Sequence, residues 1–252
     1  LYSNAKSFST IAPSGYETKV AFSGDAAVSG YGLTNINNRF STKTVAAINA
    51  DSTVNPKFTE VNYGINGALL SSDAEVAGSP SGYGQIFNHY PNGNSNQINV
   101  LNFGINDYIA YGQPKGYNSK FFIESLRAVL SRLRSQYVQE FTGLSGFSSV
   151  SLSSASGGSY QKTTSDQVVT FSTTSGFQGG TVAVGFMIED GSSAKVTIEV
   201  NGRKYRQDLV SGETVRSGIT APLVKRIPDL PSGINTFEIT FTNVSGSACL
   251  DY

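Results

Sequence analysis

The sequence predicts two parts of different fold class, an α/β segment with a parallel sheet followed by an all-β sandwich or jelly roll. In the first half, short apolar strands alternate with segments of helical period, the pattern of strands joined by crossover helices. Near residue 141 the composition shifts to Ser and Gly, and strand-like runs replace the helical period. At 252 residues, two domains are expected. We place them at residues 1–140 and 161–252, with residues 141–160 as a Ser/Gly-rich linker.

The first strand is expected at residues 19–23, where a short apolar run stops at a Gly-Asp pair. Residues 38–49 then carry apolar side chains at roughly helical spacing, after an Asn that can cap the helix. Residues 58–63 alternate as a second strand, and residues 68–76 are expected to begin the helix after it. The unit of strand, turn and helix therefore repeats.

The third unit is the clearest. Residues 97–103 are expected to form a strand. From Ser119 to Val138, apolar residues recur at steps of three and four, while Arg127, Arg132 and Arg134 fall largely on the opposite side. The pattern predicts an amphipathic helix whose apolar face lies in a core and whose arginines lie away from it.

The second part contains short strand-like runs separated by turn residues. These runs are residues 168–173, 181–189, 194–200, 203–209 and 236–242. Asp190-Gly191 and Asn201-Gly202 each lie between two such runs, and each predicts a tight hairpin because Gly accepts positive φ. Short antiparallel strands at this spacing indicate a sandwich or a jelly roll.

Composition and charge argue against several classes of partner. The 18 basic and 18 acidic residues balance, which removes the sign bias typical of proteins that bind nucleic acid, so no such partner is expected. No apolar run approaches the roughly 18 residues of a membrane span, so membrane insertion is not expected. The single cysteine, Cys249, is expected to be a buried thiol. Because the sequence has neither a phosphate-binding loop nor a Cys/His cluster of metal-ligand spacing, we expect no cofactor and no metal.

Polar residues follow all three predicted parallel strands. They read Gly-Asp-Ala-Ala-Val-Ser-Gly at 24–30, Asn-Tyr-Gly-Ile-Asn-Gly at 62–67 and Gly-Ile-Asn-Asp at 104–107. Because the carboxyl ends of parallel strands converge on one crevice, we expect these segments to lie close together. In order and context they resemble the first three sequence blocks of the SGNH, or GDSL-like, hydrolases. The resemblance covers roughly residues 19–140 and implies a flavodoxin-like three-layer α/β fold, incomplete in this chain.

The resemblance also implies a serine-esterase site at the three strand ends. In the family, a serine after the first strand attacks an ester carbonyl, and a glycine N–H and an asparagine side chain stabilise the oxyanion. Position by position, the nucleophile maps to Ala26, the oxyanion glycine to Gly67 and the oxyanion asparagine to Asn106. Asp25 and Asp107 map to supporting neighbours that shape the turns.

Two departures from the family pattern predict that the chain as written is inactive. Ala26 has no hydroxyl, so the covalent step cannot occur there. The family's last block, Asp-x-x-His, supplies the base, and this motif does not occur in the sequence. The only histidine, His89, precedes the third strand and is expected in a loop. We therefore interpret the sandwich as an insertion, with the missing block expected beyond Tyr252 in a longer parent chain.

Two hypotheses of function stay open. The first is an SGNH-type carbohydrate esterase that deacetylates surface polysaccharide as a receptor-binding module of a phage tail spike or fibre, extracellular or in the virion. Its partners would be acetylated polysaccharide or another cell-surface glycan, further copies in a homotrimer, and other tail subunits. The second is a non-catalytic glycan-binding or structural protein, in which the sandwich holds the glycan. Its candidate contact residues are the aromatic side chains of Tyr160, Phe177, Phe186 and Tyr205.

Overall fold

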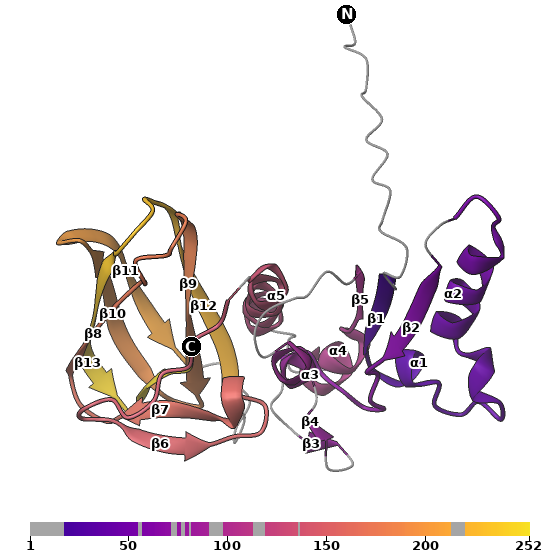
Figure 1. Ribbon diagram of the computed structural model, residues 1–252. Coiled ribbons are helices and arrows are strands. Elements are labelled where there is room, and N and C mark those ends of the chain that lie inside the picture. Colours follow the sequence, from indigo (N-terminus) through magenta and orange to yellow (C-terminus); the bar gives the residue numbers. More distant parts are fainter. Residues whose placement is uncertain are drawn as a thin grey trace, which may run out of the picture.

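The computed structural model describes most of the chain beyond residue 17 (Figure 1). The described residues are 18–54, 57–71, 75–76, 79–80, 82–90, 98–112, 119–135, 137–212 and 220–252. From one side of the molecule to the other, Figure 1 shows a two-sheet sandwich, a layer of helices, a small parallel sheet and a second layer of helices.

The small sheet has the strand order β2-β1-β5, and β1 pairs in parallel with both neighbours. Its strands are β1 (Thr18–Gly24), β2 (Phe58–Asn62) and β5 (Ile98–Asn102). The central strand is buried over its last five residues, as expected for a parallel strand covered on both faces. The register sets Gly24 beside Asn102 and Phe22 beside Asn62, so the three strands end at one edge of the sheet.

The helices follow the strand ends. They are α1 (Ala26–Ser29), α2 (Phe40–Ala50), α3 (Tyr83–His89), α4 (Ile105–Gly112) and α5 (Ser119–Arg134), with the 3-10 turns η1 (Ile36–Asn38) and η2 (Ser156–Gly158). The helix predicted to begin at residues 68–76 is wrong. Ala68 and Leu69 have no regular structure, Leu70 and Ser71 lie in a turn, and β3 (Glu75–Val76) pairs with β4 (Ser79–Pro80) as two-residue strands. The sequence missed α3, the short helix that follows them.

The sandwich consists of two antiparallel sheets. The four-stranded sheet contains, in spatial order, β11 (Arg203–Ser211), β10 (Ser193–Val200), β13 (Thr236–Ser245) and β8 (Gln167–Ser172). The five-stranded sheet contains β12 (Thr220–Leu230), β9 (Gly180–Glu189), β14 (Ala248–Leu250), β7 (Ser159–Thr163) and β6 (Ser148–Ser151). Strands β6 and β7 and the η2 turn draw on residues 141–160, the expected linker; the domain boundaries stay a prediction.

Alternating side chains of both sheets form the sandwich core. Phe186 and Ile188 of β9 meet Val196 and Ile198 of β10 and Phe241 of β13, all buried. The opposite face of the five-stranded sheet is buried as well, because α5 packs against β12. A second cluster there joins Met187, Val224 and Tyr252 of the sandwich to α3 and α5. One face of this sheet therefore packs in the sandwich core, and the other packs against the helices.

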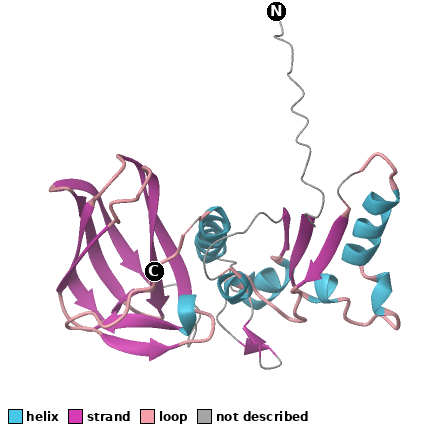
Figure 2. Cartoon of the chain, viewed as in Figure 1, coloured by secondary structure: helices cyan, strands magenta, loops and turns pink. Residues whose placement is uncertain are grey.

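The predicted flavodoxin-like three-layer fold is wrong for this chain. Antiparallel strands dominate the described structure (Figure 2), and the parallel sheet has only three strands. Helices α3 and α5 do not close a self-contained α/β domain, since their apolar residues belong to one cluster shared by the parallel sheet and the five-stranded sheet. The physical reason is that α5 packs against β12 of the sandwich and against α3, so the helix layer is shared between the parallel sheet and the five-stranded sheet.

A buried arginine lies where the helices meet the sandwich. Arg132 of α5 is 0% exposed, although the helical pattern placed it away from the core. Its guanidinium lies 4.7 Å from the ring centroid of Phe87 and 4.3 Å from that of Tyr252. It also donates hydrogen bonds to the Ser156 hydroxyl and to the carbonyl of Tyr90. The prediction was wrong for Arg132 because its part of α5 packs against α3, η2 and the last residues of the chain, whereas Arg127 and Arg134 are exposed as predicted.

Two carboxylates complete the surroundings of Arg132. The Ser156 hydroxyl donates to Glu140, and the Ser156 N–H donates to the Asp251 carboxylate at 3.1 Å. Asp251 is fully buried, and burial raises its pKa well above the usual value. Burial likewise raises the pKa of Glu140. We call the set Arg132, Phe87, Tyr252, Ser156, Glu140 and Asp251 the Arg132 cluster.

Replacing Arg132→Ala should lower the free energy of unfolding by about 3–5 kcal/mol, because it leaves the buried Asp251 and the half-buried Glu140 without their cation and removes a side chain packed against two rings. Urea unfolding followed by circular dichroism measures the loss. The matched control is Arg134→Ala, an exposed arginine of the same helix, which should change stability by less than about 0.5 kcal/mol. Equal losses in the two variants would contradict the role assigned to the cluster.

Candidate functional site

The residues predicted as an esterase site lie at the carboxyl edge of the parallel sheet. Asp25 is buried and caps α1, since its carboxylate accepts a hydrogen bond from Ala27 N–H at 3.0 Å. Ala26 is the first residue of that helix and presents a methyl group where the family has a hydroxyl. The N–H of Asp25 donates to the Asn102 carbonyl at 3.3 Å, which ties this turn to the end of β5.

The second and third segments meet beside it. Asp107 is 0% exposed, and its two carboxylate oxygens accept hydrogen bonds from the N–H groups of Leu70 and Ser71, each at 2.9 Å. Asn106 donates its side-chain amide to the Ala68 carbonyl at 3.1 Å. Gly67 precedes that carbonyl in the same turn and has a φ of 80°. The strand ends thus converge as the sequence predicts.

The stack of Tyr63 on His89 lies near this edge. His89 is the last residue of α3 and not in a loop, so that part of the prediction was wrong. The two ring centroids are 3.6 Å apart and nearly parallel. His89 keeps part of its surface in solvent, and partial desolvation of the imidazole lowers its pKa below the usual 6.5.

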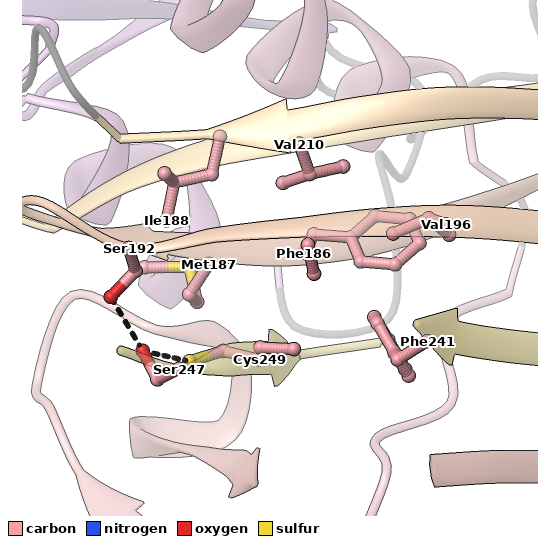
Figure 3. A pocket seen from close by; sticks show the side chains of 11 residues that line it. Phe186, Met187, Ile188, Ser192, Val196, Val210, Phe241, Ser247 and Cys249 are labelled. Carbon is pink, nitrogen blue, oxygen red and sulfur yellow. Dashed lines mark hydrogen bonds between the residues drawn. The ribbon is translucent and has the colours of Figure 1, made fainter. Parts of the chain in front are cut away.

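The enclosed pocket in Figure 3 lies inside the sandwich, between the two sheets. Its volume is about 10 Å³, and apolar side chains such as Phe186, Val196 and Phe241 line most of it. A space of this size is at the limit for one water molecule. Beside it, Cys249 is buried as predicted, and burial raises the pKa of its thiol to about 12. The pocket is therefore a packing void, and its thiol is unreactive.

The second candidate site is the outer face of the four-stranded sheet, which lies on the side of the sandwich away from the helices (Figure 1). Two rows of mostly polar side chains cross this face. One row is Gln207, Thr197, Thr240 and Val168, and the next is Lys204, Glu199, Glu238 and Thr170. The Gln207 amide donates to the Thr197 hydroxyl at 3.0 Å. We call this surface the polar face.

The end of the polar face at β8 and β13 is hollowed into an open recess of about 460 Å³. It is lined by Asp166, Gln167, Val168, Thr240, Phe241 and Thr242. Most of this space is open to solvent, so the recess is a surface depression and not an enclosed site. It offers hydroxyl, amide and carboxylate groups over a short apolar floor.

Only one of the four predicted aromatic contact residues is exposed. Tyr160 and Phe186 are buried, at 3% and 1% exposure, and Phe177 packs against the sandwich core. Tyr205 is 44% exposed and lies on β11, at the register shift opposite Ile198 and Glu199. The rows of the polar face were missed. Their signal in the sequence is the alternation of polar and apolar residues along all of β10 and along β13 as far as Phe241.

Comparison with protein-family models finds no match, and comparison with curated protein sequences finds none. Among solved structures, the exo-β-1,3-galactanase of Phanerochaete chrysosporium with galactose is 23% identical over 46% of this chain and 29% of its own, with a TM-score of 0.32. A family 35 carbohydrate-binding module from an environmental isolate is 17% identical over 45% of this chain and 89% of its own, with a TM-score of 0.34. The cycloalternan-forming enzyme of Listeria monocytogenes with a pentasaccharide substrate is 18% identical over 44% of this chain and 11% of its own, with a TM-score of 0.35. The chain spans less than a third of the length of either enzyme.

The recognition of an SGNH esterase is therefore wrong. The matched structures are a galactanase, a carbohydrate-binding module and a glycan-forming enzyme, and they are not SGNH esterases. The deacetylase function and the phage-tail assignment depended on that resemblance, so both predictions are wrong as well. The roles carried over to Ala26, Gly67, Asn106, Asp25 and Asp107 remain predictions, and their hydrogen bonds fit turn formation equally well.

His89 gives this region a measurable pH dependence. The folded chain holds the ring neutral at a pH where the unfolded chain already binds a proton, so the free energy of unfolding should fall as the pH drops from 6.5 through the lower folded pKa. An NMR titration of the single histidine should give a pKa below 6.5 in buffer and about 6.5 in urea. The His89→Phe variant, which keeps an aromatic stack on Tyr63, should lose this pH-dependent component. A folded pKa above 6.5 would contradict the assignment.

Proposed function

We propose that the protein is a non-catalytic glycan-binding protein and that the polar face is its contact surface. One observation carries the proposal. Of the two outer faces of the sandwich, the five-stranded sheet is covered by helices, whereas the four-stranded sheet presents rows of exposed or half-buried hydroxyl, amide and charged side chains.

The chemistry of this surface suits sugars. Sugar hydroxyls both donate and accept hydrogen bonds, and the polar face supplies both roles through Gln207, Thr197 and Thr240. Lys195 and Lys204 balance Glu199 and Glu238, so the surface favours neutral sugars over polyanionic ones. The exposed ring of Tyr205 offers an apolar surface for the C–H face of a pyranose.

The shape of this surface favours binding over catalysis. Chemistry on a glycan gains from a site that excludes water, because charges interact more strongly there. The polar face is a broad sheet surface with one open recess, and within the described residues the enclosed pocket holds only about 10 Å³. An extended glycan can lie across such a surface without being enclosed.

The expected extracellular location is part of the proposal, because polymeric glycans are displayed outside cells. The finer expectations named an acetylated polysaccharide, a homotrimer and tail subunits. None of these three follows from the polar face, and the proposal extends only to a glycan.

A paired substitution tests the proposal. Tyr205→Ala combined with Gln207→Ala removes an exposed ring and an amide from β11 without touching the core. After a glycan array has identified a ligand of the full chain, this variant should bind it about tenfold more weakly or worse, which corresponds to about 1.4 kcal/mol. Isothermal titration calorimetry measures the change, and mass spectrometry of the recovered glycan should show it unaltered.

The chain offers a matched control. Tyr137 and Gln139 have the same spacing and are also exposed, but they lie between α5 and the sandwich. Tyr137→Ala combined with Gln139→Ala should leave glycan affinity within about twofold. Equal weakening in both pairs, or no binding by the unaltered chain across a broad array, would overturn the proposal.

A further inference from the structure

Strand β8 forms an edge of the four-stranded sheet. It pairs with β13 on one side, and among the described residues no strand pairs with its other side. Its six residues, Gln-Val-Val-Thr-Phe-Ser, contain no charge and no proline, and their pairing with β13 runs without a register shift. An edge strand with these features presents free backbone N–H and C=O groups to any strand of matching shape.

The other three edges of the sandwich carry features that oppose such pairing. On β11, Arg203, Lys204 and Arg206 lie along a strand whose register shifts. On β12, two prolines interrupt the row of donors, and Lys225 and Arg226 add charge. Strand β6 is only four residues long. In the described part of the chain, strand β8 is the one edge of the sandwich that has no charged residue, no proline and no register shift and is longer than four residues. This edge can therefore pair with a strand of another molecule.

The sequence of β8 complements itself. We propose that two copies of the chain associate through an antiparallel pairing of β8 with β8 about a two-fold axis at Thr170. Val169 then lies opposite the partner's Phe171, and Val168 lies opposite the partner's Ser172. In this register, side chains that point into the core lie beside core-facing side chains of the partner. Apolar side chains therefore meet on the core side of the sheet, and polar or small side chains meet on its outer side.

The core side of the proposed interface adds an apolar contact. Phe171 is only partly buried, its ring stacked 4.8 Å from that of Phe237 and meeting Phe141 at 5.2 Å. The partner's Val169 would cover the exposed edge of this aromatic group. With one short strand from each copy, the interface is in the weak class below about 1,200 Å², so we expect a reversible dimer.

The pairing also has a consequence for glycan binding, and this part rests on the proposed function. Joining β8 to β8 makes one continuous sheet of eight strands, with the polar faces of both copies on the same side. A dimer would then contact a glycan polymer or a glycan-coated surface at two places and bind it more tightly than a monomer.

Substitutions on the two edge strands test the interface. Val168 on β8 and Leu209 on β11 are both exposed apolar residues of the same outer face, at 55% and 69% exposure. Sedimentation velocity of the full chain at up to roughly 200 µM should show a reversible dimer, consistent with a weak interface. Val168→Lys should shift it to monomer and Leu209→Lys should not. A monomeric unaltered chain, or a dimer that persists in Val168→Lys, would overturn the inference.

A cross-link tests the register. In the proposed pairing the Thr170 residues of the two copies face each other, so Thr170→Cys should give a disulfide-linked dimer on mild oxidation. The control is Ser172→Cys, whose copies would lie roughly 13 Å apart, four residues along the strands, and should not cross-link. The native thiol of Cys249 is buried and does not interfere. Equal cross-linking of both variants would overturn the register.

Separate measurements distinguish this interface from the proposed function. On a dense glycan surface, the unaltered chain should bind about tenfold or more tightly at concentrations where it is dimeric than where it is monomeric, whereas its affinity for a soluble oligosaccharide should not depend on protein concentration. If dimerisation is found and no glycan binds, the proposed function fails and the interface stands. If glycan binds and only monomer is found, the interface fails alone.

Discussion

Arg132 holds the two halves of the molecule together. It extends from α5, and its guanidinium packs against the rings of Phe87 and Tyr252, one from each half, which also meet each other edge to face at 5.5 Å. Ser156 links it to Glu140 and Asp251. One group of interactions therefore fixes α5, the segment of the chain between α5 and β7, and the last two residues. Removing a guanidinium from water costs desolvation free energy. The contacts of Arg132 with the two rings and the Ser156 hydroxyl, together with the nearby carboxylates, offset that cost.

This junction decides which surfaces remain free. Because α5 packs on β12, Met187, Val224 and Cys249 on the five-stranded sheet are buried under helices, and that face cannot take a ligand. The four-stranded sheet has no such cover among the described residues, and its alternation places every second side chain in solvent. A sandwich with one face occupied by its own chain therefore has one face left for another molecule.

Most local signals in the sequence predicted local structure, but the hairpin predicted at Asp190-Gly191 is wrong, because β9 and β10 lie in different sheets. The strand near residues 19–23, the helix from Ser119 and the hairpin at Asn201-Gly202 are all present, since each depends on neighbours within a few residues. The sequence did not reveal β12, whose two prolines weaken its strand pattern, nor the burial of Arg132. Both depend on α5 meeting a sheet formed much later in the chain, and no periodicity within α5 contains that information.

The loops that suggested an esterase show why short motifs mislead. After a parallel strand the chain must turn tightly into a helix, and the residues that do this are small or carry a short hydrogen-bonding side chain. Gly24 has no room for a Cβ, which would lie 2.3 Å from the Asn102 carbonyl oxygen. Asp25 caps α1, Asn62 bonds the Val28 carbonyl, and Asp107 receives two backbone N–H groups. Turn geometry thus accounts for each of these side chains without an ester substrate.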